Sequence, residues 1–412
     1  MEKKATQNSE FRIQESGVRS QKIEVLSFEA ACSFRWPFWI LTSDFCLLKF
    51  IIEEEIMKIK IIEALPKYLK PKPDTAKLSF GKHFTDHMFS MKYKEGDGWH
   101  DPVIEPYHYL QLDPTAMCLH YGQEIFEGLK AYRGKKDEIF LFRPLENIRR
   151  MNVSATRLCM APIDETVFFD ALKQFVLLEK EWIPREAGSS LYIRPTMIAT
   201  EAALGVHPSR EYLFFIIAGP VGAYYAHGFG PTKIFVSEEY VRAAPGGTGN
   251  IKSAGNYAQS LYASRIASDM GYTQVLWLDA RENKYVEEVG TSNIFFVIGD
   301  ELITPPLGGT ILPGVTRDSV MKLAAHLGVE VNERPIAMTE VIAAIEKGEL
   351  KEAFASGTAA IISPVGQIYF RKKEYLINEG KTGALADKLY NEILQIQYGI
   401  REDPFSWRVQ LA

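Results

Sequence analysis

Short apolar runs alternate with amphipathic stretches along most of the chain, and this alternation limits the fold more than any other feature. β-Branched and aromatic runs of strand length lie at residues 192–199, 212–218, 233–236 and 274–278, as expected for buried strands. Apolar residues at helical spacing predict helices at residues 164–182, 258–270, 315–327, 338–345 and 385–396. Strands and helices that alternate in this way indicate a mixed α/β (α+β) fold.

The sequence also indicates where the chain divides. Residues 219–230, "GPVGAYYAHGFG", are rich in Gly and Ala and predict a flexible connection between two α/β halves. We therefore place a small α/β domain at residues 57–226, an interdomain linker at 227–232 and a large domain at 233–412.

The first 56 residues differ from the rest of the chain. Their apolar stretch, residues 34–52, contains a proline and charged residues such as Arg35 and Lys49, so it lacks the ~20 mostly apolar residues of a spanning helix. The leader before this stretch is long and of mixed charge, and no small-residue cleavage site follows, unlike in a secretory signal. We expect residues 1–56 to be an extension that is dispensable or poorly ordered.

Charge and cysteine content exclude several classes of partner. The 412-residue chain has 47 Lys and Arg against 52 Asp and Glu, a formal net charge of −5. Binding to a nucleic-acid backbone needs a dense basic face instead. The four cysteines form no CxxC pair and no disulfide-like spacing, which favours a reducing compartment. We expect a cytoplasmic protein without nucleic-acid or membrane partners.

One lysine stands in a glycine-rich segment, "APGGTGNIKSAGNY" at residues 244–257. A phosphate-binding loop is excluded because that motif requires Gly immediately before Lys, and Ile251 precedes Lys252. Two interpretations remain from the segment alone. Lys252 is either a solvated lysine on a mobile loop, the more common case, or a lysine that forms an imine with a planar cofactor, which small neighbours would allow to approach.

A second segment, "YVEEVGTSNIFF" at residues 285–296, places two acids before an apolar run. Glu287 and Glu288 are adjacent, so on a strand they face opposite ways. Both could be surface charges near a turn. Alternatively, one carboxylate lies at the mouth of a cleft, where it would need a cationic partner such as a protonated pyridine nitrogen.

Eight blocks along the chain together resemble the branched-chain amino acid aminotransferases, which belong to the fold type IV family of pyridoxal-phosphate (PLP) enzymes. The resemblance covers the chain from about residue 80 to its end. In chain order the blocks are "FTDHM" (84–88), "LHYGQEIFEGLKAY" (119–132), "LYIRP" (191–195), "GNIKSAGNY" (249–257), "EVGTSNIF" (288–295 with Glu288 first), "LPGVTR" (312–317), "SGTA" (356–359) and "QIQYG" (395–399).

The resemblance implies a two-domain architecture with PLP between the domains, the large domain being the PLP-binding one. It implies reversible transfer of an amino group between L-leucine, L-isoleucine or L-valine and 2-oxoglutarate, giving a branched 2-oxo acid and L-glutamate. The partners would be these small molecules and a second copy of the chain, in a homodimer or a higher homo-oligomer. Other fold type IV enzymes, a D-amino acid aminotransferase or an aminodeoxychorismate lyase, are the nearest alternatives, and "LYIRP", "SGTA" and "QIQYG" argue against them.

The resemblance also assigns residues to the cofactor, and it implies no metal. Lys252 matches the catalytic lysine that holds PLP covalently and then moves a proton. Glu288 matches the carboxylate that faces the pyridine nitrogen and keeps it protonated, and Tyr257 matches the hydroxyl that binds the ring oxygen. The remaining matches to cofactor-binding positions are Arg157, Thr291, Gly314, Val315, Thr316 and Thr358, several of them phosphate ligands at a helix start.

The implied substrate pocket must accept both an aliphatic side chain and the γ-carboxylate of glutamate. Aromatic residues match its lining, although core packing is the common alternative for each of them. Arg194 matches the cation for the γ-carboxylate, and the backbone of Thr358 and Ala359 matches the α-carboxylate site together with Tyr121. The matched aromatic residues are Phe84, Tyr121, Phe126, Tyr192 and Tyr224.

Two further matches concern assembly and regulation. Leu204 and Val206, in "ALGV", resemble residues that reach into the pocket of the partner subunit. Some relatives carry a CxxC thiol switch after "SGTA", but this chain has Ala360 and Ser363 at those positions, so we expect no such switch.

Overall fold

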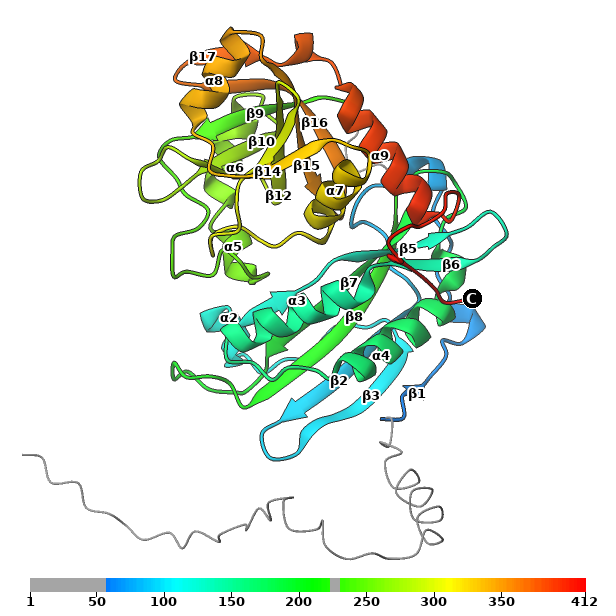
Figure 1. The fold of residues 1–412 in the computed structure, drawn as a ribbon. Coiled ribbons are helices and arrows are strands. Elements are labelled where there is room, and N and C mark those ends of the chain that lie inside the picture. Colours follow the sequence, from blue (N-terminus) through cyan, green and yellow to red (C-terminus); the bar gives the residue numbers. More distant parts are fainter. Residues whose placement is uncertain (1–56, 223–229) are drawn as a thin grey trace, which may run out of the picture. The chain divides into compact units, whose positions relative to one another are not determined.

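A computed structural model describes residues 57–222 and 230–412 of the chain. The predicted extension at residues 1–56 and the predicted pocket residue Tyr224 lie outside the described residues. The described part contains two nine-stranded sheets (Figure 1). Both sheets are mixed and helices pack on both, so the expected α/β fold is confirmed.

The first sheet is antiparallel except for one parallel pair, β1 with β3. Its central strands are long, and β7 and β8 pair along ten residues of register. The strands in sheet order are β1 (Lys60–Ile61), β3 (Gly98–Pro106), β2 (His87–Lys94), β8 (Glu211–Val221), β7 (Ser190–Ala199), β5 (Leu129–Arg133), β6 (Ile139–Phe142) and β18 (Arg408–Gln410), with β4 (Glu124–Phe126) paired to β7.

The second sheet contains parallel pairs at its centre, where β9 lies between β10 and β16. Antiparallel pairs extend it on both sides. The strands in sheet order are β11 (Val286–Val289), β10 (Gln274–Leu278), β9 (Thr232–Ser237), β16 (Ile361–Phe370), β15 (Leu350–Gly357), β12 (Ser292–Ile298), β13 (Glu301–Thr304) and β14 (Glu330–Glu333), with β17 (Lys373–Leu376) paired to β16.

The five predicted helices are all present, with two local differences, whereas the helices at Met117–Tyr121 and Pro144–Arg157 were not predicted. The helix expected at 164–182 ends earlier and is followed by a 3₁₀ turn, η3 (Lys180–Trp182), while the one expected at 258–270 is divided between α5 and α6. The helices are α2 (Met117–Tyr121), α3 (Pro144–Arg157), α4 (Glu165–Leu178), α5 (Ala254–Ala258), α6 (Leu261–Asp269), α7 (Val315–His326), α8 (Met338–Glu346) and α9 (Ala384–Gln397). Three further 3₁₀ turns are η1 (Pro66–Tyr68), η2 (Thr75–Lys77) and η4 (Asn378–Gly380).

The segment predicted to connect the two halves begins inside a strand. Gly219 belongs to β8 and pairs with Tyr192, and β8 continues to Val221, so residues 219–221 are sheet and not a flexible connection. Glycine is required at position 219 because a Cβ atom there would lie 1.9 Å from the carbonyl oxygen of His83. The glycine therefore serves a close backbone contact, which composition alone does not distinguish from flexibility.

The end of the chain returns to the first sheet. β18 pairs with β6 through Val409 and Leu141, although most of the chain after β8 belongs to the second sheet. Helix α9 precedes this return and packs against α7 and β16 (Figure 1). The last residues therefore tie the second half of the chain to the first.

Strand alternation divides the first sheet into two differently packed faces. On β5, Leu129 and Ala131 belong to a core with α3 and α4. Tyr132 points the other way, into a core with Phe295 of the second sheet and Leu389 of α9. The second face of the first sheet is therefore directed toward the elements of the second.

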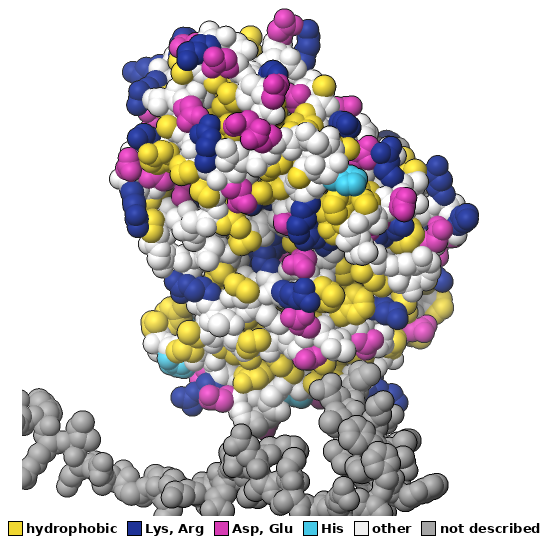
Figure 2. All heavy atoms as spheres, viewed as in Figure 1, with side chains coloured by type: hydrophobic (Ala, Val, Ile, Leu, Met, Phe, Trp, Pro, Cys, Tyr) yellow, Lys and Arg dark blue, Asp and Glu magenta, His cyan; other side chains and the backbone are white. Residues whose placement is uncertain are grey.

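The surface carries both signs of charge. On the face drawn in Figure 2, Lys and Arg side chains are interspersed with Asp and Glu, as expected for a net charge of −5. Within residues 57–222 and 230–412, no helix combines the length and the apolar character needed to cross a bilayer.

Candidate active site

The glycine-rich segment holds Lys252 in place through its backbone. The amide of Lys252 donates to Ser154 Oγ (3.1 Å), and its carbonyl accepts from the amide of Phe126 (3.1 Å). Glycine is needed upstream because a Cβ at Gly249 would lie 2.4 Å from the carbonyl oxygen of Thr310. Both backbone partners of Lys252 come from the first half of the chain, so the loop is anchored across the two sheets.

The Lys252 amine lies among predicted site residues. Its Nζ is 2.9 Å from the hydroxyl of Tyr257 in α5 and 4.9 Å from the centre of the Phe126 ring. The rings of Phe126 and Tyr257 are 4.7 Å apart. The structure thus brings together a lysine from the glycine loop, a tyrosine from the following helix and a phenylalanine from β4.

One face of β4 and β7 carries further predicted site residues next to Phe126. Ile125 and Ile193 point into the first core, so Phe126, Tyr192 and Arg194 lie on the opposite face. The Arg194 guanidinium is 4.5 Å from the centre of the Phe126 ring, and its Nη2 donates to the Tyr192 hydroxyl (3.0 Å). The Arg194 Nε is buried and has no hydrogen-bond partner among the described residues.

Phe84 lies in the same region, near Tyr192 and Arg194. A small cavity is lined by Phe84, Tyr192 and Arg194 together with backbone near Gly219. The Phe84 ring stacks on Tyr107, with 5.8 Å between ring centres. Four of the predicted substrate residues, Phe84, Phe126, Tyr192 and Arg194, therefore share one wall.

Glu288 lies on β11 and is buried, 3% exposed. Its carboxylate accepts hydrogen bonds from the Leu312 amide (3.1 Å) and the Asn293 side chain (2.9 Å), and Arg242 Nε is 2.8 Å away. Burial raises the pKa of Glu288 to about 7, and the Arg242 guanidinium acts in the opposite direction. Glu287 faces the other way and binds Thr310, as strand alternation predicts.

Glu288 and Lys252 belong to one site. Glu288 lines a small cavity together with Tyr257, Thr291 and Leu312, and Tyr257 is the residue that contacts the Lys252 amine. The Lys252 charge also contributes to lowering the pKa of Glu288. The amine and the carboxylate therefore both lie near Tyr257.

The start of α7 offers backbone donors near this cavity. Gly314 is the N-cap, and no side chain caps the first turn, which contains Val315 and Thr316. Free amide groups at a helix start favour an anion. A Cβ at Gly314 would lie 2.1 Å from Asn293 Oδ1, so glycine keeps the helix start close to the residue that binds Glu288. Thr358 lies in the turn that joins β15 to β16.

Side chains on one face of α3 bind the loop before α7 and the glycine-rich segment around Lys252. The sequence did not predict this role for α3. Arg150 Nη1 donates to the carbonyl oxygen of Pro313 (2.9 Å), just before α7. Ser154 Oγ accepts a hydrogen bond from the Lys252 amide, and Arg157 Nη2 donates to the Gly246 carbonyl oxygen (3.0 Å). Positions 150, 154 and 157 are spaced for one helix face, so periodicity places Arg150 and Ser154 on the face of the predicted Arg157 but does not name their partners. The Arg157 guanidinium thus lies on the glycine loop that carries Lys252.

A buried ion pair between Arg150 and Glu127 stabilises this face of α3. Arg150 Nε and Nη2 donate to the two oxygens of Glu127 (2.7 and 2.9 Å), and the Asn147 side chain and the Gly128 amide also donate to this carboxylate. Glu127 is fully buried, and despite that burial its pKa is lowered by the Arg150 charge and hydrogen bonds. The pair therefore holds α3 against the strand that supplies Phe126.

We expect Arg150→Met to lower the free energy of unfolding by about 3–5 kcal/mol, because removing one partner leaves Glu127 charged and buried. Denaturant unfolding of both proteins measures this. Arg149→Met is the matched control: Arg149 is half exposed and pairs with Glu146 and Glu165 at the surface, so its loss should cost less than about 1 kcal/mol. Equal effects of the two substitutions would contradict the expectation.

Two groups of predicted residues remain apart from this cluster. Tyr121 ends α2 and donates its hydroxyl to the Leu204 carbonyl oxygen, and none of its described hydrogen bonds or ring contacts reaches the Lys252 cluster. Leu204 and Val206 themselves are strongly exposed, at 62% and 84%.

The cluster fits a PLP-like cofactor. It offers a primary amine at Lys252, a hydroxyl at Tyr257, a buried carboxylate at Glu288 that is paired with Arg242, and a helix start at α7 that no described side chain caps. A phosphorylated pyridine aldehyde needs each of these groups. In the described ranges, no set of three or more His, Cys, Asp and Glu side chains could hold a metal ion.

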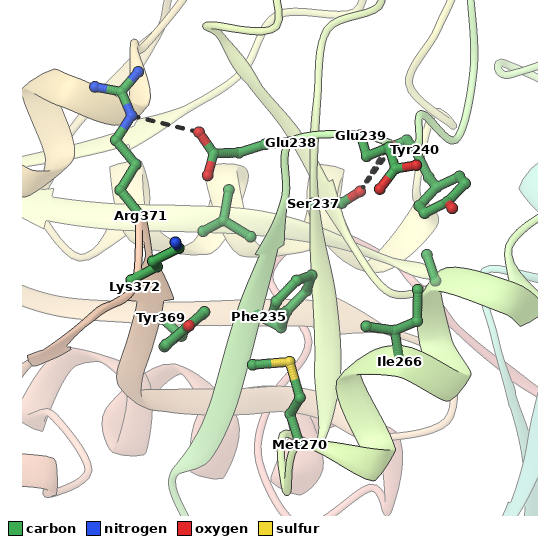
Figure 3. A pocket seen from close by; sticks show the side chains of 12 residues that line it. Phe235, Ser237, Glu238, Glu239, Tyr240, Ile266, Met270, Tyr369, Arg371 and Lys372 are labelled. Carbon is green, nitrogen blue, oxygen red and sulfur yellow. Dashed lines mark hydrogen bonds and ion pairs between the residues drawn. The ribbon is translucent and has the colours of Figure 1, made fainter.

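A third cavity, of about 530 Å³, lies elsewhere on the second sheet (Figure 3). Phe235, Tyr369 and Met270 supply an apolar floor, and Arg371 pairs with Glu238 (3.4 Å) at the rim. No predicted cofactor or substrate residue of the described ranges lines it, so this cavity is not assigned to the site.

Solved structures of known proteins share this fold. The crystal structure of the branched-chain amino acid aminotransferase of Escherichia coli is 28% identical, with a TM-score of 0.67, and the match covers 79% of this chain and 99% of that one. The T.th. branched-chain amino acid aminotransferase complexed with N-(5'-phosphopyridoxyl)-L-glutamate is also 28% identical, with a TM-score of 0.64 and coverage of 78% and 98%.

Sequence comparison agrees with the structural one. Residues 124–368 match the amino-transferase class IV family. Branched-chain-amino-acid aminotransferase 2 of Bacillus subtilis (strain 168) is 54% identical over 343 residues, which are 83% of this chain and 94% of that protein. The chain belongs to the class IV aminotransferases, and the predicted family and fold class are confirmed.

Proposed function

We propose that this protein transfers amino groups between L-leucine, L-isoleucine or L-valine and 2-oxoglutarate, reversibly and with PLP as cofactor. The predicted function agrees with the relatives. They are named branched-chain-amino-acid aminotransferase or transaminase, and the match covers most of each of them. The observation that carries the proposal is the meeting of Lys252, Tyr257 and Glu288 at one site. The alternatives, a D-amino acid aminotransferase or an aminodeoxychorismate lyase, are not favoured by these names.

Each residue of the cluster has a defined task in this reaction. When bound, PLP supplies an electron sink for the electrons released at the substrate Cα. Lys252 anchors the cofactor and, once free, its amine carries the proton removed from Cα. Glu288 holds the ring nitrogen, and Tyr257 donates its hydroxyl to the ring oxygen while it also contacts the Lys252 amine.

The phosphate and the substrate would be held by residues around this centre. For the phosphate we propose Arg157 and the donors at Thr291, Val315, Thr316 and Thr358. The support is the uncapped start of α7 and the position of Arg157 on the glycine loop. For the substrate we propose Phe84, Tyr121, Phe126, Tyr192, Tyr224 and Arg194, with Thr358 and Ala359 at the α-carboxylate.

Arg194 is proposed to bind the γ-carboxylate of glutamate. It lies beside the aromatic wall that an aliphatic side chain would contact, and its buried Nε has no partner in the described structure. A buried unpaired donor is unfavourable, so a substrate carboxylate would complete its hydrogen bonds. A leucine side chain would make no use of this charge.

We expect Arg194→Met to reduce kcat/KM for L-glutamate by about 10²-fold, the loss of a charged hydrogen bond, and kcat/KM for L-leucine much less. Half-reactions with each amino acid, followed by the absorbance of the holoenzyme, measure both values. Arg194→Lys is the matched variant and should recover part of the glutamate activity only. Equal losses for the two amino acids would exclude this role for Arg194.

The experiment for the function itself is a coupled assay of glutamate formation from L-leucine, L-isoleucine and L-valine, with their D-enantiomers alongside. Preference for a D-amino acid would overturn the proposal. We also propose a cytoplasmic location, because the cysteine spacing suits a reducing compartment, and a homodimer, supported by the exposed apolar side chains of Leu204 and Val206. The domain limits at 57–226, 227–232 and 233–412 remain predictions.

A further inference from the structure

Lys130 on β5 is a buried cation with no anionic partner among the described residues. The residue is 6% exposed, and burial alone lowers its pKa, to about 8, with no contribution from any carboxylate. Its ammonium makes one described hydrogen bond, to the carbonyl oxygen of Ala359 (2.7 Å). An ammonium carries three donors, and burying an unpaired charge is costly. Binding of an anion next to the Lys130 ammonium would offset the cost of burying this charge.

Lys130 lies on the same wall as the proposed substrate residues. It points away from the core that receives Leu129 and Ala131, and in the strand register it is directly opposite Tyr192. Directly opposed residues on one face have Cβ atoms about 5 Å apart. Tyr192 in turn binds Arg194. Two cations, Lys130 and Arg194, therefore flank one tyrosine on a single face.

The partner of Lys130 is the turn that joins β15 to β16. Residues 358–360 form this turn, and Ile361 directly after it has φ +63°. A β-branched residue in the left-handed region is strained, so the surrounding structure must hold the turn in place. The bond from Lys130 is a contact from the first sheet that does so. It also occupies the Ala359 oxygen, which would otherwise be free to repel a carboxylate at this turn.

We propose that Lys130 is a positioning residue for the substrate α-carboxylate: its ammonium holds the Ala359 carbonyl, and its charge and remaining donors favour a carboxylate at the 358–360 turn. This inference rests on the proposed function. Every amino acid and 2-oxo acid substrate carries this carboxylate, whereas only glutamate and 2-oxoglutarate carry the second one. Lys130 and Arg194 would thus divide the two carboxylates between them.

The test uses the PLP-loaded full chain with three variants. Lys130→Met removes the charge and keeps most of the stem, Lys130→Arg keeps the charge, and Lys135→Met changes an exposed lysine in the turn after β5. We expect Lys130→Met to raise KM for L-leucine and for L-glutamate by the same factor, about tenfold or more, with little change in kcat. Such a pattern reports lost uniform binding. Lys130→Arg should restore most of the affinity, and Lys135→Met should behave as the unaltered protein.

A binding titration separates charge from shape. We expect Lys130→Met to weaken binding of 4-methylpentanoate about tenfold and to leave binding of the neutral 4-methylpentanamide unchanged. Unchanged KM values, equal weakening of both probes, or no recovery with Lys130→Arg would overturn the inference. If the unaltered protein binds the carboxylate through Lys130 but transfers no amino group, the proposed function fails and the binding role stands. If it transfers amino groups and Lys130→Met leaves both KM values unchanged, only the inference fails.

Discussion

Replacing Lys252 with alanine is expected to lower kcat for transamination by about 10⁴-fold and to remove the visible absorption band of the bound cofactor. A positioned acid–base group contributes about 10²–10⁴ in rate, and the covalent attachment is lost as well. The Lys252 amine is 2.9 Å from the Tyr257 hydroxyl, and its backbone is bound by Ser154 and Phe126. Among the described residues, Lys252 is the lysine whose amine binds the Tyr257 hydroxyl, so substitution of other lysines should not have this effect.

The measurement combines absorbance spectra after PLP loading with single-turnover rates for L-leucine. Lys388→Ala, which removes an exposed lysine on α9, is the control and should match the unaltered protein. A small added amine such as methylamine should restore part of the Lys252→Ala rate, because it can carry the missing proton. A Lys252→Ala protein that kept both the band and full turnover would refute the assignment.

Glu288→Gln is expected to lower kcat/KM by about 10²–10³, the usual effect of removing a positioned electrostatic group. A glutamine cannot supply the negative charge that keeps a ring nitrogen protonated. Glu287→Gln is a close control, because Glu287 is the adjacent residue, is also buried, and faces the other side of β11 toward Thr310. Similar losses in the two variants would show that the effect is structural, and full activity of Glu288→Gln would exclude the proposed role.

The same substitution is expected to change how stability depends on pH in the cofactor-free protein. The pKa of Glu288 is about 7 in the folded chain, against an ordinary value of 4.5. The folded state therefore holds a proton that the unfolded state has lost between these values, so stability falls as pH rises from about 4.5 to 7. This carboxyl accounts for a decline of about 3 kcal/mol, which Glu288→Gln should lack. Unfolding midpoints from pH 4.5 to 8 test it, and parallel curves for the two proteins would contradict it.

Local patterns in the sequence predicted much of the fold. The four strand runs at 192–199, 212–218, 233–236 and 274–278 all lie in strands, because alternation and β-branched content act locally. Segment 219–230 was predicted less well. Gly219 and Pro220 continue β8, and position 219 is glycine because the neighbouring backbone at His83 leaves no room for a Cβ. Composition could not show this, because the contact joins residues far apart in the sequence.

The candidate site was predicted unevenly for the same reason. Lys252, Tyr257 and Glu288 stand in compact motifs, and the structure places them together. Arg242 and Arg150 were missed, although each binds an acid of the site region. Neither belongs to a local pattern that names its partner, because 46 residues separate Arg242 from Glu288 and 23 separate Arg150 from Glu127.

The sequence by itself determined the alternation of strands and helices, the family resemblance and the residues that match the catalytic positions of the family. Each of these depends on residues that are close together in the sequence. Only the tertiary structure decided which face of each strand meets the second sheet, that α3 holds the loops around Lys252, and that Lys130 is buried against the Ala359 carbonyl. Such pairings depend on how two sheets pack, and packing joins side chains that no local period relates.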